Sequence, residues 1–305
     1  MKTVRAALLA GLFIASASAV AAEPVTVCLN KDNQPFSSFK DGKESGFDVE
    51  IARAVAKRLD RPLEIRWYQR ERRSRVPVPL KTSVLLASGV CQLVGGFPLV
   101  QSSLERPAAG GDETTLPPVD GLPDEKRANP VKGAQLVASQ PYHFAGVTAV
   151  FGPKVQGEIK SLDELKPYRI GNRPASIGDL IAMAYKQGLL LKNVSHVDAR
   201  DEPFEAMARG DFDATLVEAH KFDVYRAENP QTPLRVSGLA LPIGFNLGFV
   251  TIAQNAALLK AVDAAVAELV RDGGAAQAAT AANLTWSAPQ QPAVRTGLGL
   301  ENFVK

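Results

Sequence analysis

The first third of the chain alternates short apolar runs with amphipathic stretches. Strands are predicted at 24–29, 63–68 and 91–96, and helices at 49–59 and 81–88. In the longer helix, Ile51, Val55 and Leu59 recur at helical spacing among charged residues, which is typical of a helix that covers a sheet. Strands that alternate with helices indicate a mainly parallel sheet, so the expected fold class is α/β.

A second series of the same kind occupies the middle of the chain. Its short strands and helices are predicted at 162–165, 169–171, 177–187, 194–197, 202–209, 214–217, 219–228 and 234–239. Strand-like stretches flank the series at 139–151 and 243–252, and a long helix with an apolar stripe is expected over 255–271. The pattern therefore predicts two α/β lobes, each a mainly parallel sheet with flanking helices.

The segment 101–133 interrupts this pattern. It contains five prolines, four glycines and no aromatic residue, and it shows no helical or strand period. We predict a long surface insertion that adds no core; a linker between domains is the alternative.

The first residues have the layout of a secretory signal. Lys2 and Arg5 precede an apolar run over 6–14, and small residues continue to Ala22. We expect a signal peptide over 1–22 that is cleaved on export to the periplasm, with an uncleaved anchor as the alternative.

Export changes the interpretation of the two cysteines, Cys28 and Cys91. In an oxidising compartment they are candidates for one disulfide, and two buried free thiols are the alternative.

Composition and charge exclude several classes of function. The 305 residues are 46% hydrophobic with a net charge of +3, and without Lys2 and Arg5 the balance is 33 basic to 32 acidic residues. Such a balance gives no reason to expect nucleic-acid binding. The histidines and cysteines are scattered without zinc-site spacing, and neither GxxxxGK[ST] nor GxSxG occurs, so no metal and no cofactor are expected.

Four spaced motifs resemble the family 3 (polar amino acid type) periplasmic solute-binding proteins. They are Pro35-Phe36-Ser37, Gly46-Phe47-Asp48-Val49-Glu50-Ile51-Ala52, Gly95-Gly96 and Gln140-Pro141-Tyr142, of which the second is close to the family's GFDVDLA signature. The resemblance implies the two-lobe periplasmic-binding-protein fold, with crossing hinge strands around 142–151 and 244–252. It implies a first lobe of 23–145 plus 250–305, which includes the insertion, and a second lobe of 146–249.

The resemblance also implies a function. Members of the family hold a small polar solute in the cleft between the lobes, and closure of the hinge buries it. We expect an exported monomer that captures an amino-acid-like or cationic solute for an ABC permease. A few proteins on this fold are enzymes, but the sequence shows no set of nucleophile, base and orienting residue, so no enzymatic activity is expected.

Several residues are expected to line the cleft: Phe36, Gly96, Phe97, Tyr142, Arg173, Ser176 and Glu218. Glu218 ends a strand at the place where the resemblance puts the carboxylate that meets the ligand's ammonium group; a helix cap is the alternative. Arg173 and Ser176, at a helix start, would meet an anionic group, and a solvated loop charge is the alternative for Arg173. Phe36 would stack on the solute or pack within its loop, and Tyr142 faces either the cleft or the core.

One residue type that the family uses is missing from its usual place. The family has an arginine for the ligand's carboxylate in a TxxR run a few residues after the third strand. The candidate here, Arg106, lies too far along the chain to be assigned this role, which puts an α-amino acid ligand in question.

A narrower resemblance implies a second possible function. Cys28 followed by Asn33 and Pro35-Phe36-Ser37 is similar to the CxDxNxPFS run of substrate-binding-like proteins associated with quinoprotein (PQQ-dependent) dehydrogenases. The tryptophan and arginines of 67–73 and the position of Cys91 fit the same group. This resemblance implies an accessory protein that uses the fold for protein–protein contact beside a dehydrogenase. The basic stretch that includes Arg70 would then dock an acidic partner, with a solvated loop as the alternative.

Overall fold

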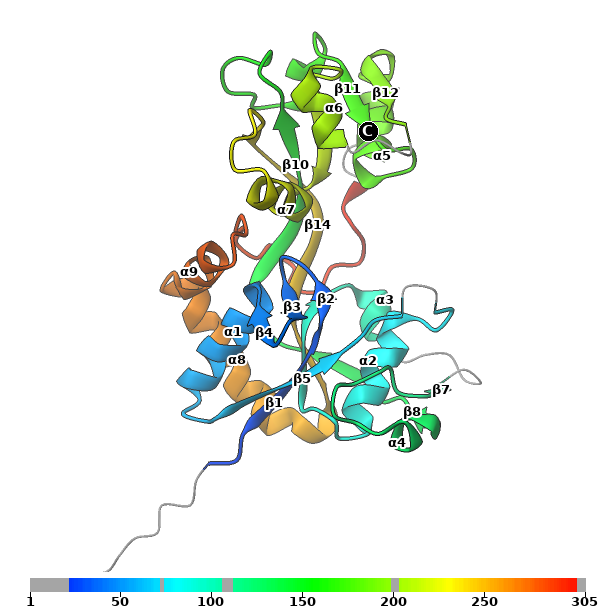
Figure 1. The fold of residues 1–305 in the computed structure, drawn as a ribbon, viewed down its shortest axis with the longest axis vertical. Coiled ribbons are helices and arrows are strands. Elements are labelled where there is room, and N and C mark those ends of the chain that lie inside the picture. Colours follow the sequence, from blue (N-terminus) through cyan, green and yellow to red (C-terminus); the bar gives the residue numbers. More distant parts are fainter. Residues whose placement is uncertain (1–21, 72–73, 106–111, 199–202, 301–305) are drawn as a thin grey trace, which may run out of the picture.

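The computed structural model describes residues 22–71, 74–105, 112–198 and 203–300. Two groups of elements lie one above the other and are joined by β10 (His143–Phe151) and β14 (Arg235–Ile252) (Figure 1). We call the lower group, which contains the first strand, the first lobe and the upper group the second lobe. The predicted signal peptide lies, except for its last residue, outside the described residues. Within the described residues, no helix is both long and apolar enough to span a membrane.

The first lobe is a three-layer arrangement around parallel strands. Its strands are β1 (Val25–Asn30), β5 (Leu63–Tyr68) and β6 (Leu93–Pro98), and its larger helices are α1 (Phe47–Arg58), α2 (Val78–Ala87), α8 (Ala256–Arg271) and α9 (Gly274–Ala281). β1 pairs in parallel with both β5 and β6. Successive side chains of a strand point to opposite faces, so Val27 and Leu29 pack with α1 and α8 whereas Cys28 packs with α2.

Cys28 and Cys91 form a disulfide, as the sequence predicts. Their Cα atoms are 5.7 Å apart across a sequence separation of 63 residues, and both side chains are buried against α2. The bond joins β1 to the turn before β6, on the side of the sheet away from α1.

The second lobe repeats the parallel arrangement on a smaller scale. Its strands and helices are β11 (Ile170–Asn172), β12 (Val194–His196), β13 (Ala214–Glu218), α5 (Ile177–Ala184), α6 (Pro203–Arg209) and α7 (Ala219–Glu228). It also contains the 3-10 turns η1 (Leu162–Leu165), η2 (Tyr185–Gln187) and η3 (Leu191–Asn193), whereas a fourth such turn, η4 (Ala253–Asn255), precedes α8. One hydrogen-bonded sheet runs through both lobes in the order β12-β11-β13-β10-β14-β6-β1-β5. β10 and β14 pair antiparallel at its centre, so the connection between the lobes is itself a strand ladder.

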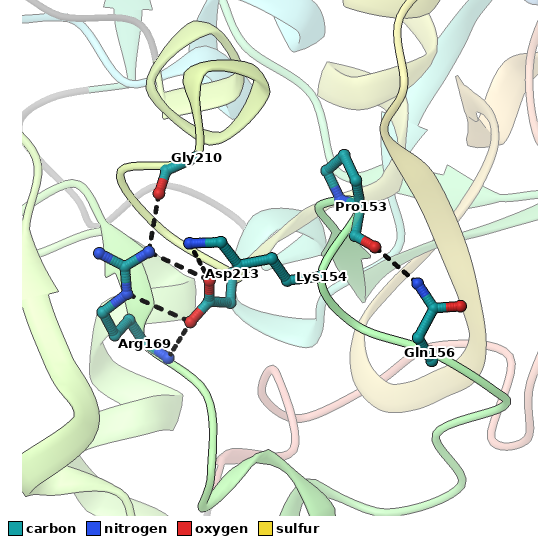
Figure 2. A network of polar contacts seen from close by, with 6 residues as sticks. All are labelled: Pro153, Lys154, Gln156, Arg169, Gly210 and Asp213. Carbon is teal, nitrogen blue, oxygen red and sulfur yellow. Dashed lines mark hydrogen bonds and ion pairs between the residues drawn. The ribbon is translucent and has the colours of Figure 1, made fainter.

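An ion pair fixes the end of the second-lobe sheet that lies away from the first lobe. The Asp213 carboxylate accepts hydrogen bonds from Arg169 through its backbone N–H (2.9 Å) and its guanidinium (3.1 and 3.2 Å), as Figure 2 shows. Burial alone would raise the pKa of Asp213, but the hydrogen bonds and charge of Arg169 outweigh it and lower the pKa. This network ties the amino ends of β11 and β13 together.

The insertion 101–133 differs from its prediction. It forms α3 (Gln101–Leu104), β7 (Glu113–Thr114), α4 (Asp124–Ala128) and β8 (Val131–Lys132). Leu116 and Val119 are about 5% exposed and belong to the same apolar cluster as α2. Val119 also forms an isolated antiparallel bridge with Tyr68, so this part of the insertion lies beside the end of β5. The prediction that the insertion adds no core is therefore wrong.

Short strands missed by the sequence pattern precede α1 and β10. β2 (Asp32–Asn33), β3 (Ser37–Lys40) and β4 (Lys43–Ser45) form a small antiparallel sheet at the edge of the first lobe. β9 (Leu136–Ala138) pairs with β14.

The C-terminal segment connects the two lobes a third time. Leu298 and Leu300 pack against the second lobe's apolar cluster, although the resemblance placed 250–305 in the first lobe. The side chain of Asn246, in β14, donates to the carbonyl groups of Gln290 (2.7 Å) and Ala293 (2.9 Å). The segment therefore runs along the hinge, and the lobe boundaries otherwise stay a prediction.

Candidate functional site

A cavity of about 290 Å³ lies between the lobes, where the parallel strands of the first lobe end. We call it the cleft cavity. Its wall includes Asn30 from β1, Tyr68 from β5, Gly96 and Phe97 from β6, Phe245 from β14, and His220 from α7 of the second lobe. Because the carboxyl ends of parallel strands meet at one edge, residues far apart in the sequence converge here.

A second cavity of about 590 Å³ adjoins the first on the side of the second lobe. We call it the second-lobe cavity. Arg173, Ser176 and Glu218 line it, together with Gln34 from the first lobe. His220 lines both cavities, so the two adjoin at this side chain. The structure thus divides the predicted binding residues between two neighbouring hollows.

Gly96 forms part of the floor of the cleft cavity in a conformation that favours glycine. Its φ is +67°, and a Cβ atom there would lie 2.3 Å from Oδ2 of Asp48. Its N–H donates a 2.7 Å hydrogen bond to the hydroxyl of Tyr142. Backbone, rather than a side chain, therefore faces the cavity at this position.

Tyr142 lies in the core rather than in the cleft. Its side chain is fully buried, and its hydroxyl donates to Oδ1 of Asp48 at 2.8 Å. Burial raises the pKa of Tyr142 well above its usual range, and it raises the pKa of Asp48 to about 7. We therefore assign Tyr142 no ligand contact; it positions Gly96 from behind.

Phe36 contacts the second lobe across the cleft. Its ring centroid lies 5.1 Å from that of His220 and 6.1 Å from that of His143. Burial lowers the pKa of His220, and it lowers the pKa of His143 to about 3. His143 is therefore neutral near pH 7, and the uncharged aromatic surface continues from the first lobe to the second.

Glu218 lines the second-lobe cavity beside a cation of its own chain. Its carboxylate accepts a 2.9 Å hydrogen bond from Nζ of Lys221, one turn along α7. Both side chains are partly exposed, so water screens this pair and a bound cation could replace Lys221. The expected role of Glu218 toward an ammonium group stays a prediction.

The start of α5 already carries a carboxylate. Ser176 caps the helix by accepting a 3.2 Å hydrogen bond from the N–H of Asp179, and the carboxylate of Asp179 accepts one of 2.9 Å from the N–H of Ala175. Asp179 is buried, and its other oxygen lies 3.0 Å from Nε2 of His196. Two N–H groups near this helix start, those of Ala175 and Asp179, are thus used within the chain, and the Asp179 carboxylate opposes an anion beside Arg173 and Ser176.

Arg70 is a cleft residue that the sequence did not single out as ligand-binding. It follows β5 and lines the cleft cavity. Oδ1 of Asn30 accepts a hydrogen bond from its backbone N–H (3.4 Å), and the preceding N–H, of Gln69, donates to Pro118 in the insertion (2.8 Å). β1 and the insertion therefore hold the Arg70 backbone from both sides. The rule that parallel strands end at the ligand-binding edge could have indicated it.

Hydrogen bonds also join the lobes outside the cavities. The buried carboxylate of Asp223, in α7, accepts hydrogen bonds from the backbone N–H (2.8 Å) and hydroxyl (2.6 Å) of Thr285, after α9. Together with the Asn246 contacts, this fixes one flank of the second lobe against the first. Among the described residues, no group of three or more potential metal ligands lies close enough together to hold a metal ion.

Solved structures show that this is the two-lobe solute-binding fold. The L-cystine solute receptor of Neisseria gonorrhoeae, in its unliganded open conformation, matches with a TM-score of 0.60 at 19% identity, over 88% of this chain and 96% of that chain. An ancestral cyclohexadienyl dehydratase matches with a TM-score of 0.59 at 18% identity, over 86% and 93%. An ancestral cationic amino acid solute binding protein matches with a TM-score of 0.52 at 20% identity, over 84% and 93%. The predicted fold class is confirmed.

Within this fold, the sequence comparison points to one family. The model of the bacterial extracellular solute-binding proteins, family 3, matches residues 25–82, which include the Pro35-Phe36-Ser37 and Gly46–Ala52 motifs. The family model thus confirms the resemblance to family 3 over this segment, and the solved structures show the fold over most of the chain. No curated protein matches the sequence. The narrower resemblance to the quinoprotein-associated group stays a prediction.

Proposed function

We propose that the protein is an exported receptor that captures a small polar organic solute between its two lobes. The observation that supports this most directly is the cleft cavity, which lies at the carboxyl ends of β1, β5 and β6 and has a second-lobe side chain in its wall. Open α/β sheets bind their ligands at this edge. A volume of about 290 Å³ is at the lower end of the range for small-molecule sites, which suits a solute of amino-acid size.

Binding would couple the solute to the arrangement of the lobes. A solute in the cleft cavity touches first-lobe residues and His220 together, so it binds best when the lobes are close. The β10–β14 ladder and the Asp223–Thr285 contact provide the connection about which the lobes would move.

We further propose a periplasmic location and delivery of the solute to an ABC permease. The charged start, short apolar run and small residues of 1–22 support export, and the match to family 3 supports delivery. The disulfide between Cys28 and Cys91 suits an oxidising compartment.

Solute binding accounts for the cleft better than catalysis does. His143 is buried in the core, and its low pKa leaves it neutral, so it is a poor proton donor near pH 7. Glu218 is paired with Lys221 in the second-lobe cavity. Among the described residues of the cleft cavity, no carboxylate stands opposite His220 to complete an acid–base pair.

The proposal is tested by thermal unfolding of the chain from residue 23 with a panel of amino acids, polyamines and small carboxylates. A solute with micromolar affinity at about a thousandfold excess should add about 4 kcal/mol of stability. If no member of the panel shifts the unfolding temperature, and a quinoprotein dehydrogenase co-purifies instead, the receptor function is wrong and the accessory function is supported.

A further inference from the structure

Arg70 differs in charge from the other described residues that line the cleft cavity. It is the one permanently charged side chain among the described residues that line this cavity, and no described carboxylate lies within ion-pair distance of its guanidinium. Its charge acts on the neighbouring Tyr68 hydroxyl, whose pKa burial raises and Arg70 lowers. The Arg70 side chain is exposed at the rim of the hollow, and a guanidinium there with no carboxylate partner among the described residues is suited to an anion from outside.

The rest of the wall is aromatic and neutral. Phe36, Phe97 and Phe245 contribute apolar ring surface, and Asn30 and Ser103 contribute uncharged polar groups. No aspartate or glutamate is among the described residues that line the cleft cavity. Carboxylates line the two hollows next to it: Glu218 lines the second-lobe cavity, which adjoins at His220, and Asp32 and Glu71 line a hollow that shares Tyr68 and Arg70 with the cleft cavity.

We propose that Arg70 binds the carboxylate of the solute, and that the solute is a small carboxylic acid with an aromatic or other apolar body and no ammonium group. This inference rests on the proposed receptor function and names the solute class for the same cleft. The guanidinium holds the carboxylate through paired N–H···O bonds, and the body lies against the phenylalanine rings. An ammonium group in the cleft cavity would meet the cation of Arg70 and, among the described residues that line this cavity, no carboxylate.

The second lobe supplies no better anion site. Near the start of α5 the N–H of Ala175 is bonded to Asp179 and the N–H of Asp179 to Ser176, and the Asp179 carboxylate repels an incoming anion. Lys221 is paired with Glu218. Arg70 thus takes the place of the arginine that the family has after its third strand, from a different strand end.

The experiment compares four probes of one shape by calorimetric titration: 3-phenylpropionate, its neutral amide, phenylalanine and phenethylamine. We expect 3-phenylpropionate to bind, the amide and phenylalanine to bind at least about tenfold more weakly, and phenethylamine to bind weakest. The reason is that the free energy of a hydrogen bond to a charged group corresponds to at least about a tenfold change in affinity. The comparison of the acid with phenylalanine tests the absence of an ammonium site.

Substitutions of Arg70 then test whether its side chain binds the carboxylate. Arg70→Gln should weaken 3-phenylpropionate about tenfold to a hundredfold, and Arg70→Lys, which keeps the charge without the planar fork, should have an intermediate effect. Arg66→Gln is the matched control, since Arg66 lies on β5, pairs with Glu64 at 2.7 Å and does not line the cavity. The control should bind as the parent does, and circular dichroism should show both glutamine variants folded.

The outcomes separate the two proposals. Equal binding by Arg70→Gln and the parent, or preference for phenylalanine or phenethylamine over the acid, overturns the assignment of Arg70 and leaves the receptor function standing. Failure of the parent to bind any of these probes or any member of the wider panel overturns the receptor function, and this inference with it.

Discussion

Replacing Asp48 with asparagine should remove a pH dependence of stability from the first lobe. Asp48 is almost completely buried at the start of α1, behind Gly96, and its carboxyl accepts a hydrogen bond only from Tyr142 among the described side chains. Burial raises its pKa from 3.8 to about 7, against the lowering effect of that hydrogen bond. Between these values the folded protein keeps the proton that the unfolded chain has released, so the free energy of unfolding falls as pH rises.

The magnitude follows from the size of the shift. Each pKa unit corresponds to about 1.4 kcal/mol, so the rise from 3.8 to about 7 corresponds to a loss of about 4 kcal/mol. This stability is fully present below the pKa of the unfolded chain, 3.8, and is lost as the pH rises through the folded pKa of about 7. Asparagine has no proton to lose, so Asp48→Asn should gain about 4 kcal/mol relative to the parent from about pH 4 to about pH 8.

The assay is urea unfolding followed by tryptophan fluorescence across this pH range. Trp67 and Trp286 both pack in the first lobe, so the signal reports the lobe that contains Asp48. His143, with its pKa lowered to about 3, changes stability in the opposite direction with pH, but it is common to both proteins and cancels in the difference. Asp41→Asn, at an exposed turn, is the matched control. Parallel pH curves for Asp48→Asn and the parent would refute the reasoning.

Three further variants test the packing of the first lobe by chemical unfolding. Gly96→Ala should destabilise the protein by at least about 1–3 kcal/mol, because of its positive φ and the approach of Cβ to Asp48; a neutral effect would show that the floor can relax. Leu116→Ala should cost about 2–5 kcal/mol, as for a core leucine, whereas a change below about 0.5 kcal/mol would return the insertion to the surface. Replacing Cys28 and Cys91 with serine should cost about 4 kcal/mol for a loop of this length, and equal unfolding midpoints of the double variant and the parent would contradict a disulfide.

The elements of both lobes could be predicted where the periodicity is strong. β5 has the predicted bounds, and α1 begins two residues before its prediction because Phe47 and Asp48 form its first turn. Other elements had no such signal. The strands β2 to β4 are short and rich in charged and turn-forming residues, and Leu116 and Val119 are isolated among prolines and glycines, so only tertiary contact shows them.

The candidate site could be predicted in part. The resemblance indicated Phe36, Gly96 and Phe97, which do line the cleft cavity, because these residues lie in or directly beside recognisable motifs. The orientation of Tyr142 depends on a hydrogen bond to Asp48, which lies 94 residues away in the sequence. Arg70 lies in a basic stretch in which the sequence alone does not distinguish the arginine that lines the cleft cavity from the other arginines.

The central claim is that a solute binds in the cleft cavity between the lobes, and filling that cavity tests it most directly. Ser103, on α3, lines the cavity, whereas the adjacent Ser102 is exposed. Calorimetric titration with the solute that binds the parent should show one-to-one binding that Ser103→Trp abolishes and Ser102→Trp retains. Binding by Ser103→Trp with the affinity of the parent would contradict the account.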